Sequence, residues 1–228
     1  MSLLSETFAT TRAEGRAALV GYLPAGFPSA AEAVAVIAAM VENGVDIVEV
    51  GLPYSDPLMD GPVIQSAVDT ALAGGTRIRD VLACVAATAA SGAPALVMSY
   101  WNPIERYGTV RFADELAAAG GVGVITPDLT PEEAGECIAA TDAARLDRVF
   151  LVAPSSTDER IQTVAGVTTG FVYAASTMGV TGVRTAVSGA AEQLVARVRA
   201  ATTLPVCVGL GVSTGAQAAE VAGYADGV

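Results

Sequence analysis

Apolar and polar positions follow one repeating pattern along the chain, in which a short run rich in Val, Ile and Leu precedes a longer, alanine-rich amphipathic run. The short runs predict strands and the longer runs predict helices. The expected strands lie at 17–22, 45–51, 95–99, 122–126, 148–152, 170–174 and 205–208. The expected helices lie at 5–15, 29–43, 63–73, 77–91, 110–119, 131–140, 157–165, 189–201 and 213–222, with Ser29 as a helix cap and Gly44 as a stop.

Most of the expected strands are apolar throughout instead of alternating, which is typical of a parallel sheet covered by helices. Repeated strand–helix units therefore predict an α/β fold, and a closed (β/α)8 TIM barrel fits the pattern best. A doubly wound open sheet is the alternative, but no G-x-G-x-x-G motif follows the first expected strand. No break divides the chain, so we expect residues 1–228 to form a single domain.

The last residues, 224–228, lie where an eighth strand would begin. A barrel without that strand would leave an open sheet edge with unpaired backbone groups. We therefore expect the eighth strand–helix unit to be missing from this sequence, so that the domain is incomplete at its C-terminal end. The missing part matters for function, because loops after the seventh and eighth strands usually form the phosphate site of such barrels.

Composition narrows the possible partners and the compartment. Apolar residues make up 52% of the chain, but the longest uncharged stretches, 81–104 and 161–183, contain Gly, Ser and Thr and split into a helix and a strand. Neither stretch predicts a membrane span, and no secretory signal opens the chain, so we expect a cytoplasmic protein. The net charge of −12 argues against nucleic acid as a partner, because phosphate backbones require clustered Lys and Arg.

The sequence contains no histidine and no lysine, so proton transfer near neutral pH must use carboxylates, Tyr or Cys with shifted pKa values. Cys84, Cys137 and Cys207 are widely spaced in apolar surroundings, which indicates buried, reduced thiols. Without histidine or a C-x-x-C pair, we expect no metal site.

The most informative segment is an apolar strand followed by a proline-rich loop. Glu49 stands near the end of the strand, where burial predicts a raised pKa. Asp60 follows in a loop that Pro53, Pro57 and Pro62 stiffen. One acid on a strand end and another on the loop beyond it predict a positioned acid/base pair, although a buried Glu satisfied by hydrogen bonds is the simpler alternative.

Two glycine-rich segments, 178–183 and 209–213, follow the last two expected strands. Glycine lets backbone N–H groups approach an anion, and the helix that Ser213 is expected to cap adds a partial positive charge. Together these segments predict a phosphate site that needs no Lys or Arg. An apolar wall suited to a flat aromatic group is expected from Tyr22, Leu58, Ile64, Tyr100 and Ile125.

Several motifs occur in a distinctive order: VEVGLPYSDP at 48–57, DGP at 60–62, MSYWNPI at 98–104, PDL at 127–129 and GVTG at 179–182. On these residues the chain resembles the alpha subunit of tryptophan synthase over essentially its whole length. The resemblance implies a lyase of tryptophan biosynthesis that cleaves indole-3-glycerol phosphate to indole and glyceraldehyde 3-phosphate by a retro-aldol reaction. It also implies no cofactor in this chain and a pyridoxal-phosphate-dependent beta subunit as partner, in an alpha2-beta2 complex.

The resemblance also assigns roles to individual residues. Glu49 looks like the general acid/base, which protonates the indole ring carbon and removes the proton of the side-chain hydroxyl. Asp60 looks like the partner of the indole N–H and is expected in a wetter, hydrogen-bonded setting that keeps it ionised. Tyr173 would help to orient Glu49.

The remaining assignments concern binding. Thr181 looks like part of a loop that closes over the site and orders Asp60, while Gly182 and Gly211 would meet the phosphate. Tyr22 stands where the family often has Phe, so this chain adds a hydroxyl that must be solvated or paired.

Three other interpretations remain at this point. The chain is a different phosphate-binding barrel (an isomerase or synthase), a free-standing indole-3-glycerol-phosphate lyase, or a non-catalytic barrel that binds a partner. Loops at 53–62 and 102–107 are expected on the face that would meet a partner.

Overall fold

The computed structural model describes residues 2–175, 189–209 and 211–228. Its strands are β1 (Val20–Pro24), β2 (Ile47–Gly51), β3 (Ala95–Met98), β4 (Gly123–Ile125), β5 (Asp147–Val149), β6 (Leu151–Val152), β7 (Val172–Ala175) and β8 (Val206–Gly209). Its helices are α1 (Leu3–Ala13), α2 (Ala30–Glu42), α3 (Pro62–Ala73), α4 (Ile78–Ala90), α5 (Trp101–Tyr107), α6 (Thr109–Ala118), α7 (Gly135–Ala144), α8 (Asp158–Val167), α9 (Gly189–Ala201) and α10 (Gly215–Ala222).

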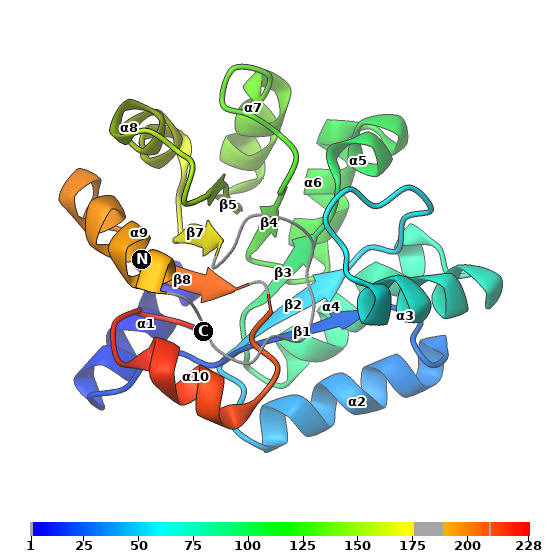
Figure 1. The fold of residues 1–228 in the computed structure, drawn as a ribbon. Coiled ribbons are helices and arrows are strands. Elements are labelled where there is room, and N and C mark those ends of the chain that lie inside the picture. Colours follow the sequence, from blue (N-terminus) through cyan, green and yellow to red (C-terminus); the bar gives the residue numbers. More distant parts are fainter. Residues whose placement is uncertain (1, 176–188, 210) are drawn as a thin grey trace.

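The strands form a ring with the helices outside it, as Figure 1 shows. All strand pairs are parallel and follow the orders β1-β2-β3-β4-β5 and β6-β7-β8. Phe150 separates β5 from β6, and its carbonyl accepts a hydrogen bond from the Tyr173 N–H at 3.2 Å. The fifth expected strand is therefore continuous along the chain but locally irregular. This arrangement confirms the TIM-barrel prediction.

The C-terminal residues 226–228 occupy the space between β8 and β1. Gly227 pairs in parallel with both Ala18 and Cys207. The Val208 N–H donates to the Gly227 carbonyl at 3.0 Å, and the Val20 N–H donates to the Val228 carbonyl at 2.7 Å. These residues therefore take the place of the eighth strand, where the sequence predicts its beginning, and they supply backbone partners to both neighbouring strands.

Side chains of each strand alternate between the barrel interior and the layer beneath the helices. On β2, Ile47 packs inside the barrel with residues such as Leu96 and Phe171. Val48 and Val50 point outward and pack in the larger cluster that includes buried residues of the surrounding helices. Because both faces are buried, the strands are apolar throughout, and Glu49 shares the inner face with Ile47.

Some element boundaries differ from the expected ones. Helix α5 occupies the segment expected as a loop at 102–107, because Asp128 caps it by accepting hydrogen bonds from the Trp101 N–H at 2.9 and 3.1 Å. Helix α7 begins at Gly135 and not at Pro131, because a turn precedes it in which the Glu133 N–H donates to the Thr130 carbonyl. The expected cap Ser29 and stop Gly44, with φ of +98°, are confirmed.

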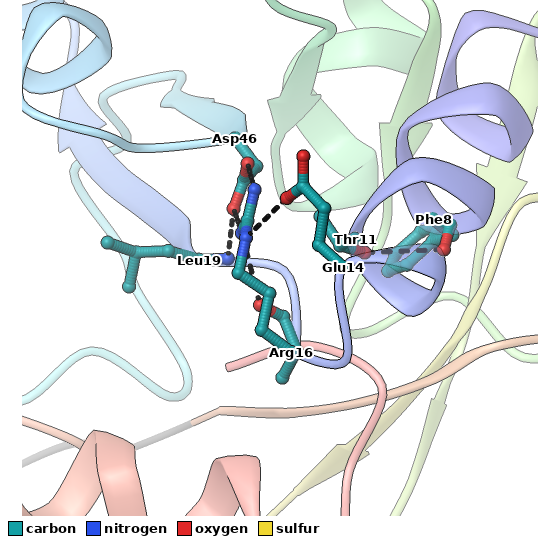
Figure 2. Close-up of polar contacts among 7 residues, drawn as sticks. Phe8, Thr11, Glu14, Arg16, Leu19 and Asp46 are labelled. Atoms are coloured by element: carbon teal, nitrogen blue, oxygen red, sulfur yellow. Dashed lines mark hydrogen bonds and ion pairs between the residues drawn. The ribbon is translucent and has the colours of Figure 1, made fainter.

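Strand β1 begins at Val20 and not at Ala17, and polar contacts hold the residues that precede it. Figure 2 shows Arg16 holding Asp46 through two bonds of 2.6 and 2.8 Å, while Glu14 contacts the same guanidinium at 2.8 Å. Asp46 also accepts a hydrogen bond from the Leu19 N–H at 2.8 Å. Burial alone would raise the pKa of Asp46, but the bonds to Arg16 and Leu19 lower it overall. The carboxylate thus links the starts of β1 and β2.

We expect Asp46→Asn to lower the free energy of unfolding by about 1–2 kcal/mol at pH 7, because the amide loses the charged partner of a half-exposed arginine. Since the folded-state pKa of Asp46 is depressed, its contribution is present above about pH 4 and disappears as pH falls further. Denaturant unfolding of both proteins between pH 7 and pH 3 measures this. Glu14→Gln, at the exposed partner of the same arginine, is the control, and an equal loss in that variant would contradict the assignment.

Candidate active site

A cavity of about 560 Å³ opens at the carboxyl ends of the strands. Its walls come from several strands and from the segments that follow them. The sequence-predicted residues that line it are Tyr22, Glu49, Asp60, Ile64, Tyr100, Tyr173 and Gly211. Residues from β1, β2, β7 and three loops thus meet in one space, although they lie far apart in the sequence.

Glu49 projects from the inner face of β2 into the floor of this cavity. The residue is 5% exposed, and no described residue donates a hydrogen bond to its carboxyl group. Burial raises the pKa of Glu49 to about 7, because the ionised form loses hydration that no charged partner replaces. The expected pKa shift is present, and at neutral pH the group exchanges readily between its acid and base forms.

Asp60 lies on the loop between β2 and α3 and is held by Tyr100. The Tyr100 hydroxyl donates to Oδ1 of Asp60 at 2.8 Å and accepts a hydrogen bond from the Met59 N–H at 2.9 Å. Burial raises the pKa of Asp60 above its usual value, while the bond from Tyr100 lowers it. The expected hydrogen bond is present, but the setting is drier than expected because the loop folds over the cavity.

The loop that carries Asp60 is fixed to α5 by contacts that the sequence did not reveal. The rings of Tyr54 and Tyr100 pack with their centres 5.7 Å apart. The Asn102 amide donates to the Tyr54 hydroxyl at 2.9 Å, and the Gln65 amide donates to the Asp60 carbonyl at 2.7 Å. The prolines stiffen the loop, but these side chains fix where it lies.

Two members of the expected apolar wall do not line the cavity. Ile125 is fully buried at the end of β4 and packs inside the barrel with Leu96 and Val149. Its neighbour in the sheet, Met98, reaches the cavity instead. Leu58 is 69% exposed and lies outside the lining. Alternation along a strand fixes the face of a side chain but not its height along the barrel axis.

Two tyrosines line opposite parts of the cavity by packing over glycines of the neighbouring strand. A β-carbon on Gly51 would clash with the Tyr22 hydroxyl and lie 2.8 Å from its Cζ. A β-carbon on Gly209 would clash with the Tyr173 hydroxyl in the same way. Both glycines lie at inward-facing positions, so the absence of a side chain makes room for each ring.

The other end of the cavity is formed by the loop after β8 and the start of α10. Gly211 adopts φ of +89°, a conformation that favours glycine. The cap of α10 is Thr214 and not the expected Ser213, because the Thr214 hydroxyl accepts from the Gln217 N–H. The Ser213 N–H donates instead to the Gln217 side chain at 2.9 Å. The first turn of α10 leaves N–H groups without partners inside the helix, as an anion site requires. Thr181 and Gly182 lie outside the described residues.

Cys207 is a lining residue that the sequence analysis placed only among buried thiols. It is 3% exposed, and burial raises its pKa, with a further contribution from the nearby Glu49. Its inward position on β8, two residues before Gly209, is the signal that places it here. Cys84 and Cys137 are buried free thiols, as expected.

Within residues 2–175, 189–209 and 211–228, no group of three or more His, Cys, Asp or Glu side chains is arranged to hold a metal ion. In the same residues, no helix is both long enough and apolar enough to span a bilayer.

Comparison with known proteins gives a consistent result. A family model described as tryptophan synthase alpha chain matches residues 8–228. The tryptophan synthase alpha chain of Thermobifida fusca is 64% identical, with 100% of this chain and 86% of that relative covered. That of Nocardia farcinica is 62% identical, over 100% of this chain and 85% of the relative.

Solved structures agree in fold as well as in sequence. A structure of Mycobacterium tuberculosis tryptophan synthase matches with a TM-score of 0.95 and 58% identity, covering 100% of this chain and 87% of that one. The tryptophan synthase subunit alpha of Legionella pneumophila matches with a TM-score of 0.88 and 32% identity, covering 100% of this chain and 85% of that one. By sequence along almost its whole length and by its barrel, the chain belongs to the tryptophan synthase alpha chain family.

Proposed function

We propose that this cavity cleaves indole-3-glycerol phosphate to indole and glyceraldehyde 3-phosphate by a retro-aldol reaction. Membership of the family makes the chain a lyase subunit of tryptophan biosynthesis. The observation that carries the specific mechanism is a buried Glu49, with a pKa of about 7, in the same cavity as the hydrogen-bonded Asp60. The sequence similarity disfavours the isomerase, synthase and non-catalytic alternatives.

Glu49 serves in turn as acid and as base. In its protonated form it gives a proton to the indole ring carbon that carries the glycerol side chain, which leaves the ring positively charged. The resulting carboxylate then takes the proton of the neighbouring side-chain hydroxyl. The carbon–carbon bond breaks, its electron pair returns to the ring, and the hydroxyl carbon becomes the aldehyde. A pKa near the working pH suits both steps.

Asp60 stabilises the intermediate charge. Its carboxylate accepts a hydrogen bond from the indole N–H, whose acidity increases once the ring is protonated. Tyr100 keeps one carboxylate oxygen in place, so Asp60 meets the substrate without first having to reorient. Thr181, which lies outside the described residues, would also help to order Asp60.

The remaining lining suits the two ends of the substrate. Tyr22, Ile64, Tyr100 and Tyr173 supply flat, mostly apolar contacts for the indole, and Tyr173 helps to orient Glu49. Ile125 supports this wall from beneath without lining the cavity. The phosphate binds to backbone N–H groups of Gly182, Gly211 and the first turn of α10.

We further propose a cytoplasmic alpha2-beta2 assembly with a tryptophan synthase beta subunit, which carries pyridoxal phosphate and consumes the indole. The alpha chain itself then needs no cofactor. The exposed loop at 53–62 and helix α5 lie beside the cavity mouth and would meet that subunit. Indole release measured with and without added beta subunit separates this proposal from a free-standing lyase: strong stimulation supports the assembly, and equal rates contradict it.

We expect Glu49→Gln to lower kcat for indole release by at least about 10³-fold with little change in substrate affinity, because the amide neither gives nor takes the proton. Asp60→Asn should lose a comparable part of kcat, since it keeps the shape but not the charge. Single-turnover indole assays and binding titrations measure both effects. Near-normal turnover by Glu49→Gln would remove this residue from the mechanism.

The raised pKa of Glu49 predicts a dependence on pH that does not require turnover. Because the folded pKa is about 7 and the ordinary value is 4.5, the folded protein binds the extra proton between these pH values. Wild-type stability therefore falls relative to Glu49→Gln as pH rises through this window, by about 3 kcal/mol in all. Chemical denaturation at several pH values measures the difference. A constant difference from pH 4 to pH 8 would show that Glu49 has an ordinary pKa.

A further inference from the structure

Tyr22 brings a third polar group to the two carboxyls. It pairs with Glu49 in the register of β1 and β2, and both side chains line the cavity. No described residue forms a hydrogen bond with its hydroxyl, which faces the cavity. In the mechanism above, Tyr22 acts only through its ring, so the hydroxyl has no assigned task.

Gly51 determines where that hydroxyl lies. The Tyr22 ring packs over Gly51 at the end of β2, because glycine has no side chain that would block it. Gly51 stands at the inward position next beyond Glu49, and the loop that carries Asp60 begins just after it. The hydroxyl is therefore held above Glu49 and toward Asp60.

The charges around the hydroxyl make it a permanent donor. Burial raises the pKa of Tyr22, and the nearby carboxyl groups of Asp60 and Glu49 raise it further, so the proton stays in place at any working pH. The other titratable groups that line the cavity are Tyr173 from β7 and Cys207 from β8. No Arg occurs among the described lining residues, and the hydroxyls of Ser99, Ser213 and Thr214 are bonded to other partners, so the neutral phenols and the thiol are the donors nearest to an ionised carboxyl.

Each carboxylate can accept a further hydrogen bond from the Tyr22 hydroxyl. An ionised carboxylate has about four lone-pair sites, of which Tyr100 fills one on Asp60. Glu49 becomes an unpaired buried charge as soon as it gives up its proton. We propose that Tyr22 is a positioning residue whose hydroxyl, held over Gly51, stands between Glu49 and Asp60 and donates to whichever carboxyl is ionised.

The inference rests on the proposed function for its kinetic test. Asp60 must be ionised and Glu49 protonated, so kcat/KM should be bell-shaped in pH. Removing a donor to the ionised forms raises both pKa values. Tyr22→Phe should therefore move both limbs of the bell to higher pH, by about half a unit to one unit. Tyr224→Phe, which removes a buried phenolic hydroxyl that has no hydrogen-bond partner among the described residues and lies outside the cavity lining, should leave the profile unchanged.

An infrared titration tests the same inference without substrate. The carboxylic-acid carbonyl band that disappears in Glu49→Gln reports Glu49, and its midpoint should rise in Tyr22→Phe. Gly51→Ala, which displaces the hydroxyl without removing it, should raise the midpoint in the same direction. If Tyr22→Phe changes only KM, or leaves both titrations unchanged, the hydroxyl does not serve the carboxyls and the inference is overturned. If the wild type cleaves no substrate, the proposed function fails, while the infrared midpoint still decides this inference.

Discussion

The exclusion of water from a carboxyl group at the end of β2 is the constraint on which the site depends. Glu49 lies on the inner face of a strand whose outer face is also buried, and it is only 5% exposed at the floor of the cavity, so its charge is poorly hydrated. A cation beside it would remove the pKa shift, because opposite charge favours the ionised form. The described lining instead places neutral phenols and a thiol around it. The raised pKa of Cys207 reflects the same dry environment.

The two carboxyls differ because different structures support them. Glu49 belongs to a strand, whose place in the barrel is fixed by hydrogen bonds to its neighbours. Asp60 belongs to a loop, and its place depends on Tyr100, which is itself anchored by the Met59 N–H. The Tyr100 contact that orders the loop also donates a hydrogen bond to the Asp60 carboxyl, which offsets part of the effect of burial on its pKa. Order and ionisation are therefore linked in Asp60, whereas the sheet fixes the backbone of Glu49 without a hydrogen bond to its carboxyl.

The sequence predicted the structural features that depend on residues close together in the chain. It missed features that depend on contacts between residues far apart in the sequence. An apolar run that ends in a proline-rich loop was enough to find Glu49 and Asp60. Helix α5 was missed because Asp128, from another loop, caps it. Ile125 was placed in the cavity wall because the alternation of side chains along a strand does not show how far along the barrel axis a residue lies. The pairing of Gly227 with Ala18 and Cys207 agrees instead with the eighth strand expected to begin at 224–228, because the repeating pattern locates a strand even where its partners are distant in the sequence.

The need for a protonated Glu49 restricts how this acidic chain can bind a phosphate, because the binding group must not lower the pKa of Glu49. The net charge of −12 opposes a dianionic substrate, and a lysine in the cavity would be the simplest remedy, yet the chain has none. A full positive charge there would also lower the pKa of Glu49 and take away its proton at neutral pH. In the proposed site, backbone N–H groups at the start of α10 would attract the phosphate with partial charges whose effect falls off within about one helical turn. Phosphate binding by the glycine-rich loop near Gly211 would therefore leave the pKa of Glu49 raised. A lysine that bound the phosphate would lower that pKa.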